Sequence, residues 1–196
     1  MAKIAQVDLD GVLNEYSGKY NEYEVPKIKK GAKEFLEKLA ENYDIEIFTV
    51  RNKIRTIEWV GNVSRMVDQT LFPYEFKFID VKTGQGMFDA IKTMIVRGAP
   101  AIGIAGAHGV VLYAQELAKE NLTREEFVAK LLEKADYIAT SRPTAVNLMW
   151  AVKKQKEIIE NSKSDIAGLI EELKENGIKL ENEDIEINKK IGDYGA

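Results

Sequence analysis

The sequence predicts a mixed α/β (α+β) fold, in which a short βαβ fragment precedes a small β-meander and a helical domain. Three observations support this prediction. Two strand-like segments flank a helix-like segment near the start of the chain. A hairpin-like turn then separates two further strand-like segments, and from Gly86 onward most of the chain has helical spacing of apolar residues. We therefore expect two domains, residues 1–52 and residues 53–196.

The first domain is predicted from two apolar segments and the helix between them. Residues 4–7 form a short apolar run that ends at an Asp-Leu-Asp-Gly sequence, and they predict the first strand. Phe35 and Leu39 lie at helical spacing and predict a helix over residues 32–42. Residues 45–50 predict the second strand. A strand, a helix and a strand in this order usually give a parallel strand pair.

A β-meander is predicted next along the chain. Residues 56–59 and 63–69 predict two strands around a Gly61-Asn62 turn, which is a typical hairpin sequence. Residues 75–81 alternate well enough to predict a third strand.

The rest of the chain predicts helices, near residues 86–95, 100–119, 123–138, 143–161, 164–176 and 182–191. Pro100 and Pro143 suit the first turn of a helix. Thr123 and Glu126 have the spacing of a capping box. Gly177 suits a helix end.

Composition excludes several classes of site. The 196 residues correspond to one or two domains at about 150 residues each. The absence of cysteine excludes a disulfide scaffold, a cysteine-ligated metal site and a cysteine nucleophile within this sequence. His108 is the only histidine and has apolar sequence neighbours, so we expect a packed side chain and no Ser-His-Asp triad.

Charge and hydropathy limit the expected partners. The chain has 28 Lys and Arg against 32 Asp and Glu, a net charge of −4, so broad electrostatic capture of nucleic acid is not expected. The apolar run over residues 99–113 is too short to span a bilayer. No secretory signal is evident at the start. We therefore expect a cytoplasmic protein with no nucleic-acid or membrane partner.

Two aspartates at the end of the first predicted strand suggest metal and phosphate chemistry. Asp8 and Asp10 are two residues apart, so on an extended chain their side chains point the same way. Such a pair can hold Mg²⁺, or one carboxylate can attack phosphorus while the other relays a proton. Thr49 ends the second predicted strand, where its hydroxyl could hold a phosphoryl oxygen. In the alternative reading, the aspartates merely end a strand.

Residues 8–13 and 48–51 resemble the first two motifs of the haloacid dehalogenase-like phosphatases. The resemblance implies that Asp8 is the nucleophile, Asp10 the acid/base and Thr49 a phosphate ligand, with Mg²⁺ as cofactor held by the two aspartates. It covers about the first 52 residues. The lysine and the further acidic pair that this family uses have no match here.

Two arginines precede predicted helix starts. Arg97, Gly98 and Ala99 come directly before Pro100, and a helix N-terminus attracts anions through its free N–H groups and dipole. Gly98 and Ala99 allow close approach of a ligand, and the Arg97 fork matches a phosphate. Arg142 likewise comes directly before a proline, Pro143, at the start of the helix predicted over residues 143–161. Together they suit a small phosphorylated ligand, and the alternative is that both arginines are surface residues or structural clamps.

Several segments are similar to the methylthioribose-1-phosphate isomerase family. They are residues 55–59, 68–69, 90–103, 141–150 and 183–196, and the similarity spans about residues 54–196. The wider superfamily includes regulatory subunits of initiation factor 2B and ribose-1,5-bisphosphate isomerase. Residues 53–196 would then be the N-terminal domain of such an isomerase.

The resemblance implies conversion of 5-methylthioribose 1-phosphate to 5-methylthioribulose 1-phosphate, an aldose–ketose isomerisation of methionine salvage and amino-acid biosynthesis, without a cofactor. It implies that Arg97, Gly98, Ala99 and Arg142 bind the phosphorylated sugar, and it makes a homodimer an expectation. The family's catalytic cysteine and aspartate lie in a C-terminal Rossmann-like domain that residues 1–196 do not include, so we expect these residues by themselves to be inactive. Two alternatives stay open: a Mg²⁺-dependent phosphatase, and a non-catalytic sugar-phosphate-binding or interaction module related to initiation factor 2B subunits.

Overall fold

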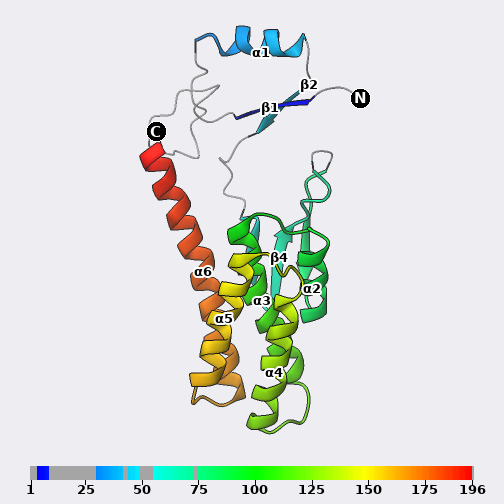
Figure 1. The fold of residues 1–196 in the computed structure, drawn as a ribbon, viewed down its shortest axis with the longest axis vertical. Helices are drawn as coiled ribbons and strands as arrows, with labels where there is room; N and C mark the ends of the chain where they lie inside the picture. The colour runs from blue at the N-terminus through cyan, green and yellow to red at the C-terminus, as the bar shows by residue number, and fades with distance from the viewer. Residues whose placement is uncertain (1–3, 9–29, 42–43, 49–54, 73–74, 196) are drawn as a thin grey trace. The chain divides into compact units, whose positions relative to one another are not determined.

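The computed structural model describes residues 4–8, 30–41, 44–48, 55–72 and 75–195 (Figure 1). The chain divides into two compact units. Unit 1 comprises Met1–Ile54 and Glu186–Ala196, and unit 2 comprises Arg55–Ile185.

Unit 1 contains the predicted strand–helix–strand sequence: β1 (Ile4–Asp8), α1 (Ala32–Ala40) and β2 (Asp44–Phe48). The two strands pair in parallel from Ile4 opposite Asp44 to Asp8 opposite Phe48, which confirms the predicted pairing. The described helix ends two residues before the predicted Asn42. β2 is described over Asp44–Phe48, and residues 49–50 of the predicted strand lie outside the described residues.

Unit 2 begins with a three-stranded antiparallel sheet. Its strands are β3 (Ile57–Val60), β4 (Val63–Val67) and β5 (Phe78–Val81), in the spatial order β3-β4-β5. The predicted hairpin is confirmed, and Gly61 has the positive φ of +60° that its two-residue turn requires. The third strand is shorter than predicted and begins at Phe78.

Five helices follow: α2 (Gly84–Lys92), α3 (Ala99–Leu117), α4 (Arg124–Ala139), α5 (Val146–Asn161) and α6 (Ile166–Gly195). Pro100 lies in the first turn of α3, as predicted. The capping box of α4 is also confirmed, because Thr123 and Glu126 exchange both of its hydrogen bonds.

Gly177 does not end a helix, which corrects the prediction. The helices expected over residues 164–176 and 182–191 form the single helix α6. Gly177 is a buried residue of this helix, and a Cβ there would lie 3.1 Å from Cδ2 of His108. The glycine therefore allows α6 to pass close to the histidine ring.

Pro143 does not begin a helix either, because α5 starts at Val146. The Ala145 N–H donates to the Arg142 carbonyl oxygen over 2.9 Å, so residues 142–145 form a turn. Proline suits the second position of such a turn, where its fixed φ is the required one. Pro143 correctly indicated a change of local structure at this point, but a turn forms here and the helix begins three residues later.

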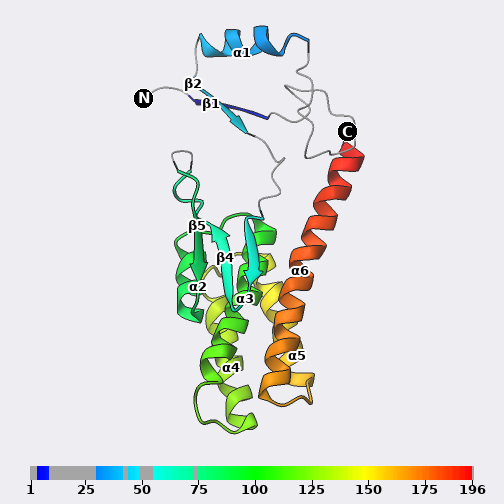
Figure 2. The same cartoon turned by 180° about the vertical axis from the view of Figure 1, so that it is seen from behind.

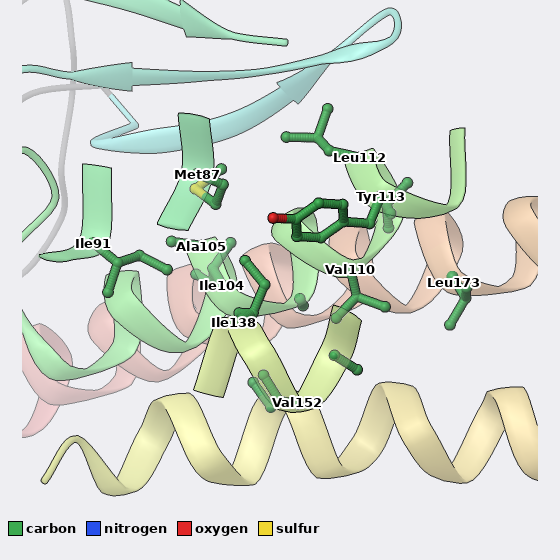
Figure 3. Close-up of a cluster of buried hydrophobic side chains, with 14 of the residues drawn as sticks. Met87, Ile91, Ile104, Ala105, Val110, Leu112, Tyr113, Ile138, Val152 and Leu173 are labelled. Carbon is green, nitrogen blue, oxygen red and sulfur yellow. The ribbon is translucent and has the colours of Figure 1, made fainter. Parts of the chain in front are cut away.

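The core of unit 2 is built around α3. Figures 1 and 2 show the sheet on one side of α3, and α4 and α5 on the other. Buried side chains from the neighbouring helices converge on α3 (Figure 3), among them Met87 of α2, Ile138 of α4, Val152 of α5 and Leu173 of α6. Each of these four is at most 2% exposed. This central position explains why α3 is apolar on all sides.

Candidate functional site

Helices α3 and α5 pack against each other and run parallel. A Cβ on Gly103 of α3 would lie 3.0 Å from the backbone oxygen of Asn147 in the first turn of α5. Further along both helices, the Gln155 side-chain amide donates to the Ala107 carbonyl oxygen over 3.2 Å. The contacts advance in the same direction on both helices, so their N-termini lie at the same end of unit 2.

The start of α3 is formed by Arg97, Gly98 and Ala99. Gly98 is the N-cap residue, with φ of +94° and ψ of 133°, a conformation that glycine adopts readily. No side chain caps this N-terminus. Arg97 is exposed and has no carboxylate partner among the residues that the structure describes. Free N–H groups and an unpaired guanidinium together favour an anion here.

The start of α5 repeats these features. Its N-cap residue, Ala145, supplies no side-chain hydrogen bond to the helix. Arg142 is half-buried in the turn before it and, within the described part of the chain, likewise has no acidic partner. The neighbouring Ser141 is buried, and its hydroxyl donates to the Ile138 carbonyl oxygen over 2.7 Å. Ser141 therefore anchors the turn that carries Arg142.

Gln69 contacts the Arg97 loop and was not singled out from the sequence as a site residue. Its backbone N–H donates to the Ile95 carbonyl oxygen over 3.0 Å, and its side-chain amide donates to the Arg97 carbonyl oxygen over 3.4 Å. The acceptors are backbone atoms of a segment 26 to 28 positions later along the chain. In the sequence, Gln69 was noted only as part of a segment similar to the isomerase family. Nothing there indicated that it contacts the residues before α3.

The single histidine is buried, as expected, but its surroundings are not apolar. Nδ1 of His108 lies 2.9 Å from the Ser64 hydroxyl, and Nε2 lies 3.0 Å from Oε1 of Glu181. Nε2 and Oε1 are close enough for an ion pair, but their geometry does not form a hydrogen bond. The sequence neighbours of His108 gave no sign of these polar contacts, because Ser64 and Glu181 belong to β4 and α6, which are distant in sequence.

Glu181 is held by further groups. The backbone N–H of Trp59 donates to it over 2.8 Å, and Nη1 of Arg55 lies 3.4 Å from Oε2. The Trp59 indole and the His108 ring pack in a T-shaped arrangement, with 5.1 Å between the ring centroids and 76° between the ring planes. Ser64 and His108 are fully buried and Glu181 is 3% exposed. A serine, a histidine and a carboxylate are thus in contact, but no substrate can reach the serine, so the cluster is structural.

The residues of the phosphatase resemblance belong to unit 1. Asp8 is the last residue of β1, opposite Phe48 of β2. Asp10 and Thr49 lie outside the described residues. Across the ranges that the structure describes, no group of three or more His, Cys, Asp or Glu side chains could hold a metal ion. In the same ranges, no helix is both long and apolar enough to cross a membrane.

The shifted pKa values of unit 2 have structural causes. The pKa of Asp80 is lowered by its hydrogen bond from Arg65 on the neighbouring strand. Burial raises the pKa of Tyr113 to about 12. These shifts follow from packing and pairing, so they do not mark an acid–base site.

Comparison with protein families matches residues 95–196 to the model described as the initiation factor 2 subunit family. The match begins just before Arg97 and covers slightly more than half of the chain. It includes both helix starts described above.

Curated relatives match a longer part of the chain. The methylthioribose-1-phosphate isomerase of Thermoanaerobacter sp. (strain X514) is 45% identical over 144 residues, which are 73% of this chain and 41% of the relative. The 5-deoxyribose 1-phosphate isomerase of Clostridium botulinum (strain Okra / Type B1) is 40% identical over 144 residues, with 72% and 41% covered. The chain thus spans about two fifths of the length of the curated relatives it matches.

Two solved structures are similar to the fold. The 5-methylthioribose 1-phosphate isomerase of Pyrococcus horikoshii OT3 superposes with a TM-score of 0.68 at 36% identity, over 74% of this chain and 40% of that one. The translation initiation factor eIF-2B subunit delta of A. fulgidus superposes with a TM-score of 0.63 at 33% identity, over 68% and 38%. Both neighbours support the α+β arrangement of unit 2.

Proposed function

Because the chain belongs to the initiation factor 2 subunit family, we propose that unit 2 forms part of the sugar-phosphate site of a methylthioribose-1-phosphate isomerase. The observation that carries this proposal is the parallel packing of α3 and α5. It brings together two helix N-termini without side-chain caps, each preceded by an arginine that lacks a carboxylate partner in the described structure. The names of relatives at 40–45% identity support the choice of substrate.

In this proposal, the substrate phosphate lies at the start of α3. The N–H groups of Gly98 and Ala99 donate to its oxygens, and the guanidiniums of Arg97 and Arg142 supply charge-assisted hydrogen bonds. The reaction is the cofactor-free conversion of 5-methylthioribose 1-phosphate to 5-methylthioribulose 1-phosphate in methionine salvage. These four residues bind and orient the sugar phosphate and do not themselves transfer the hydrogen. A homodimer is also part of the proposal.

Calorimetric titration with inorganic phosphate and with 5-methylthioribose 1-phosphate tests the site. We expect both ligands to bind, and Arg97→Ala and Arg142→Ala each to weaken binding roughly tenfold or more, because each removes a charge-assisted hydrogen bond. Arg65→Ala is the matched control, since Arg65 is an exposed arginine already paired with Asp80. Equal affinity in all three variants, or no binding by the unaltered chain, would contradict the proposal.

A non-catalytic binding module is the second candidate, and the likeness to the A. fulgidus subunit favours it. One face of α5 near its start is apolar and exposed: Val146 is 78%, Met149 48% and Trp150 49% exposed. Such a face suits contact with another protein. Residues 1–196 by themselves are expected to be inactive, so absence of turnover does not separate the two candidates. Turnover would favour the isomerase.

A phosphatase activity of unit 1 is supported by one described feature. Asp8 ends β1 directly opposite Phe48, the last residue of β2, and the predicted site positions Asp10 and Thr49 follow these two residues closely in the sequence. In this proposal Asp8 and Asp10 hold Mg²⁺. Mg²⁺-dependent hydrolysis of p-nitrophenyl phosphate that Asp8→Asn abolishes would support it. Absence of hydrolysis with or without Mg²⁺ would refute it.

A further inference from the structure

We propose that Gln69 is a positioning residue that holds the peptide between Arg97 and Gly98 with its N–H directed at the bound phosphate. This inference rests on the proposed function of unit 2 as a phosphate-binding site. It assigns a role to a residue that does not itself touch the ligand.

Gln69 bonds to the segment before α3 at two points. Its backbone N–H donates to the Ile95 carbonyl oxygen over 3.0 Å, and its side-chain amide donates to the Arg97 carbonyl oxygen over 3.4 Å. The first bond fixes the position of the segment. The second reaches the last carbonyl group before the N-cap residue Gly98.

A hydrogen bond to the Arg97 carbonyl also orients the Gly98 N–H. The peptide unit is planar and trans, so the C=O of Arg97 and the N–H of Gly98 point in opposite directions. With the carbonyl turned toward Gln69, the N–H points away from it, and it has no acceptor among the described residues. An anion at the start of α3 would supply that acceptor.

The peptide needs such a restraint because one of its two flanking residues is glycine. Gly98 has φ of +94°, and a Cβ at this position would meet no atom within 4 Å. Glycine therefore adopts this backbone conformation without strain, but it also allows the Arg97–Gly98 peptide to rotate with little steric hindrance. The bond from Gln69 opposes that rotation.

Gln69 is itself placed by a structured loop. The Asp68 carboxylate accepts hydrogen bonds from the Thr70 backbone N–H over 3.0 Å and from the Thr70 hydroxyl over 2.6 Å. The backbone N–H of Asp68 donates to the Lys77 carbonyl oxygen over 2.9 Å. Gln69 therefore extends from a braced turn at the end of β4.

The test uses the full chain labelled with ¹⁵N-glycine and the variants Gln69→Met and Gln69→Glu. Methionine keeps the side-chain length and the backbone bond to Ile95 but removes the amide donor, and glutamate replaces that donor with an acceptor. We expect the Gly98 amide resonance to shift and the Kd for inorganic phosphate to rise roughly tenfold, with an unchanged thermal midpoint. Gln85→Met is the matched control, because Gln85 is an exposed glutamine on α2.

The outcomes separate this inference from the proposed function. If the unaltered chain binds phosphate and Gln69→Met changes neither the Kd nor the Gly98 resonance, the inference is overturned and the function stands. If the unaltered chain does not bind phosphate but Gln69→Met moves the Gly98 resonance, the function falls and the orienting role remains. Loss of the folded circular dichroism spectrum in both Gln69 variants would overturn the inference and assign Gln69 to stability.

Discussion

At the scale of single residues, the contacts of His108 with Ser64 and Glu181 join three elements of unit 2. Ser64 comes from β4, His108 from α3 and Glu181 from α6, and all three side chains are buried. Buried polar groups are costly unless they are paired, so each of these residues depends on the other two. The cluster consequently restricts where α6 can lie along the sheet and α3.

Replacing Glu181 with alanine should therefore destabilise unit 2 strongly. The change removes the acceptor of the part-buried Trp59 N–H and the carboxylate beside the buried His108 Nε2, at a cost of about 1–3 kcal/mol. Glu181→Gln should cost less, because the amide oxygen can still accept from Trp59. Urea denaturation measures both free energies of unfolding.

Glu183→Ala is the control for this experiment. Glu183 lies on the same helix but is exposed, and its pair with Lys179 at 3.8 Å is also exposed. We expect a change of no more than about 0.5 kcal/mol. Equal losses for Glu181→Ala and Glu183→Ala would show that the buried cluster does not stabilise unit 2.

Gly177→Ala should destabilise unit 2 although alanine favours helices by about 1 kcal/mol over glycine. The new Cβ would lie 3.1 Å from His108 Cδ2, and the ring cannot move away easily because Ser64 and Glu181 hold it. A double-mutant cycle with His108→Ala checks this reason, since the propensity gain should reappear once the ring is gone. A stabilising effect of Gly177→Ala alone would contradict it.

At the scale of elements, α4 shows a helix start that local sequence decides. Thr123 accepts from the Glu126 backbone, and Glu126 accepts from the Thr123 backbone N–H and hydroxyl. The starts of α3 and α5 lack such caps, because Gly98 and Ala145 occupy the N-cap positions. A helix that begins without its own cap leaves N–H groups for a ligand, and this difference distinguishes the candidate site from an ordinary helix start.

The capping box should make unit 2 sensitive to acid. The backbone N–H of Thr123 holds the pKa of Glu126 below its usual 4.5, so the folded state binds this proton less readily than the unfolded state. The resulting stabilisation is present above about pH 4.5 and is lost as the pH falls through the lower folded value. Urea midpoints measured from pH 6 to pH 2.5 should fall less steeply for Glu126→Gln than for the control Glu125→Gln.

Removing the Thr123 hydroxyl tests the same element at neutral pH. Thr123→Ala should cost about 1 kcal/mol of stability, the usual value for a lost N-cap. Thr70→Ala is a comparison outside the helices, since that hydroxyl bonds to Asp68 within a loop. An unchanged urea midpoint for Thr123→Ala would mean that the cap does not contribute to folding.

At the scale of the whole molecule, the buried hydrophobic cluster around α3 lies within unit 2. Its buried members run from Ile57 on β3 to Leu180 on α6. Such a core, with the sheet on one side of α3 and α4 and α5 on the other, is large enough to fold without residues 1–54. We therefore treat the proposed phosphate site as a property of unit 2.

A fragment of residues 55–196 should then fold and bind phosphate as the full chain does. We expect its circular dichroism spectrum to be helical, its unfolding to be cooperative, and its Kd for inorganic phosphate to lie within about twofold of the full chain's value. An unfolded fragment, or a folded fragment that fails to bind phosphate when the full chain binds it, would show that residues 1–54 are required.

Sequence patterns were sufficient to predict the features that depend on neighbouring residues. Helical spacing, alternation and turn residues placed the βαβ segment, the hairpin at Gly61 and the start of α4, because each of these is stabilised by contacts within a few positions. The same local patterns identified Arg97 and Arg142 as residues before helix starts. The predictions at Gly177 and Pro143 were wrong. Glycine also suits a close helix contact, as inside α6, and proline also suits a turn, as before α5.

Which distant segments meet became evident from the three-dimensional packing alone. Apolar spacing shows that a helix has a buried face but not which helix covers it, so the parallel packing of α3 and α5 had no signal in the sequence. The contacts of Glu181 with His108, and of Gln69 with the Arg97 carbonyl, join residues from separate elements in the same way. The arginines and the glycine of the candidate site were therefore predictable as residues, whereas their assembly at one end of unit 2 was not.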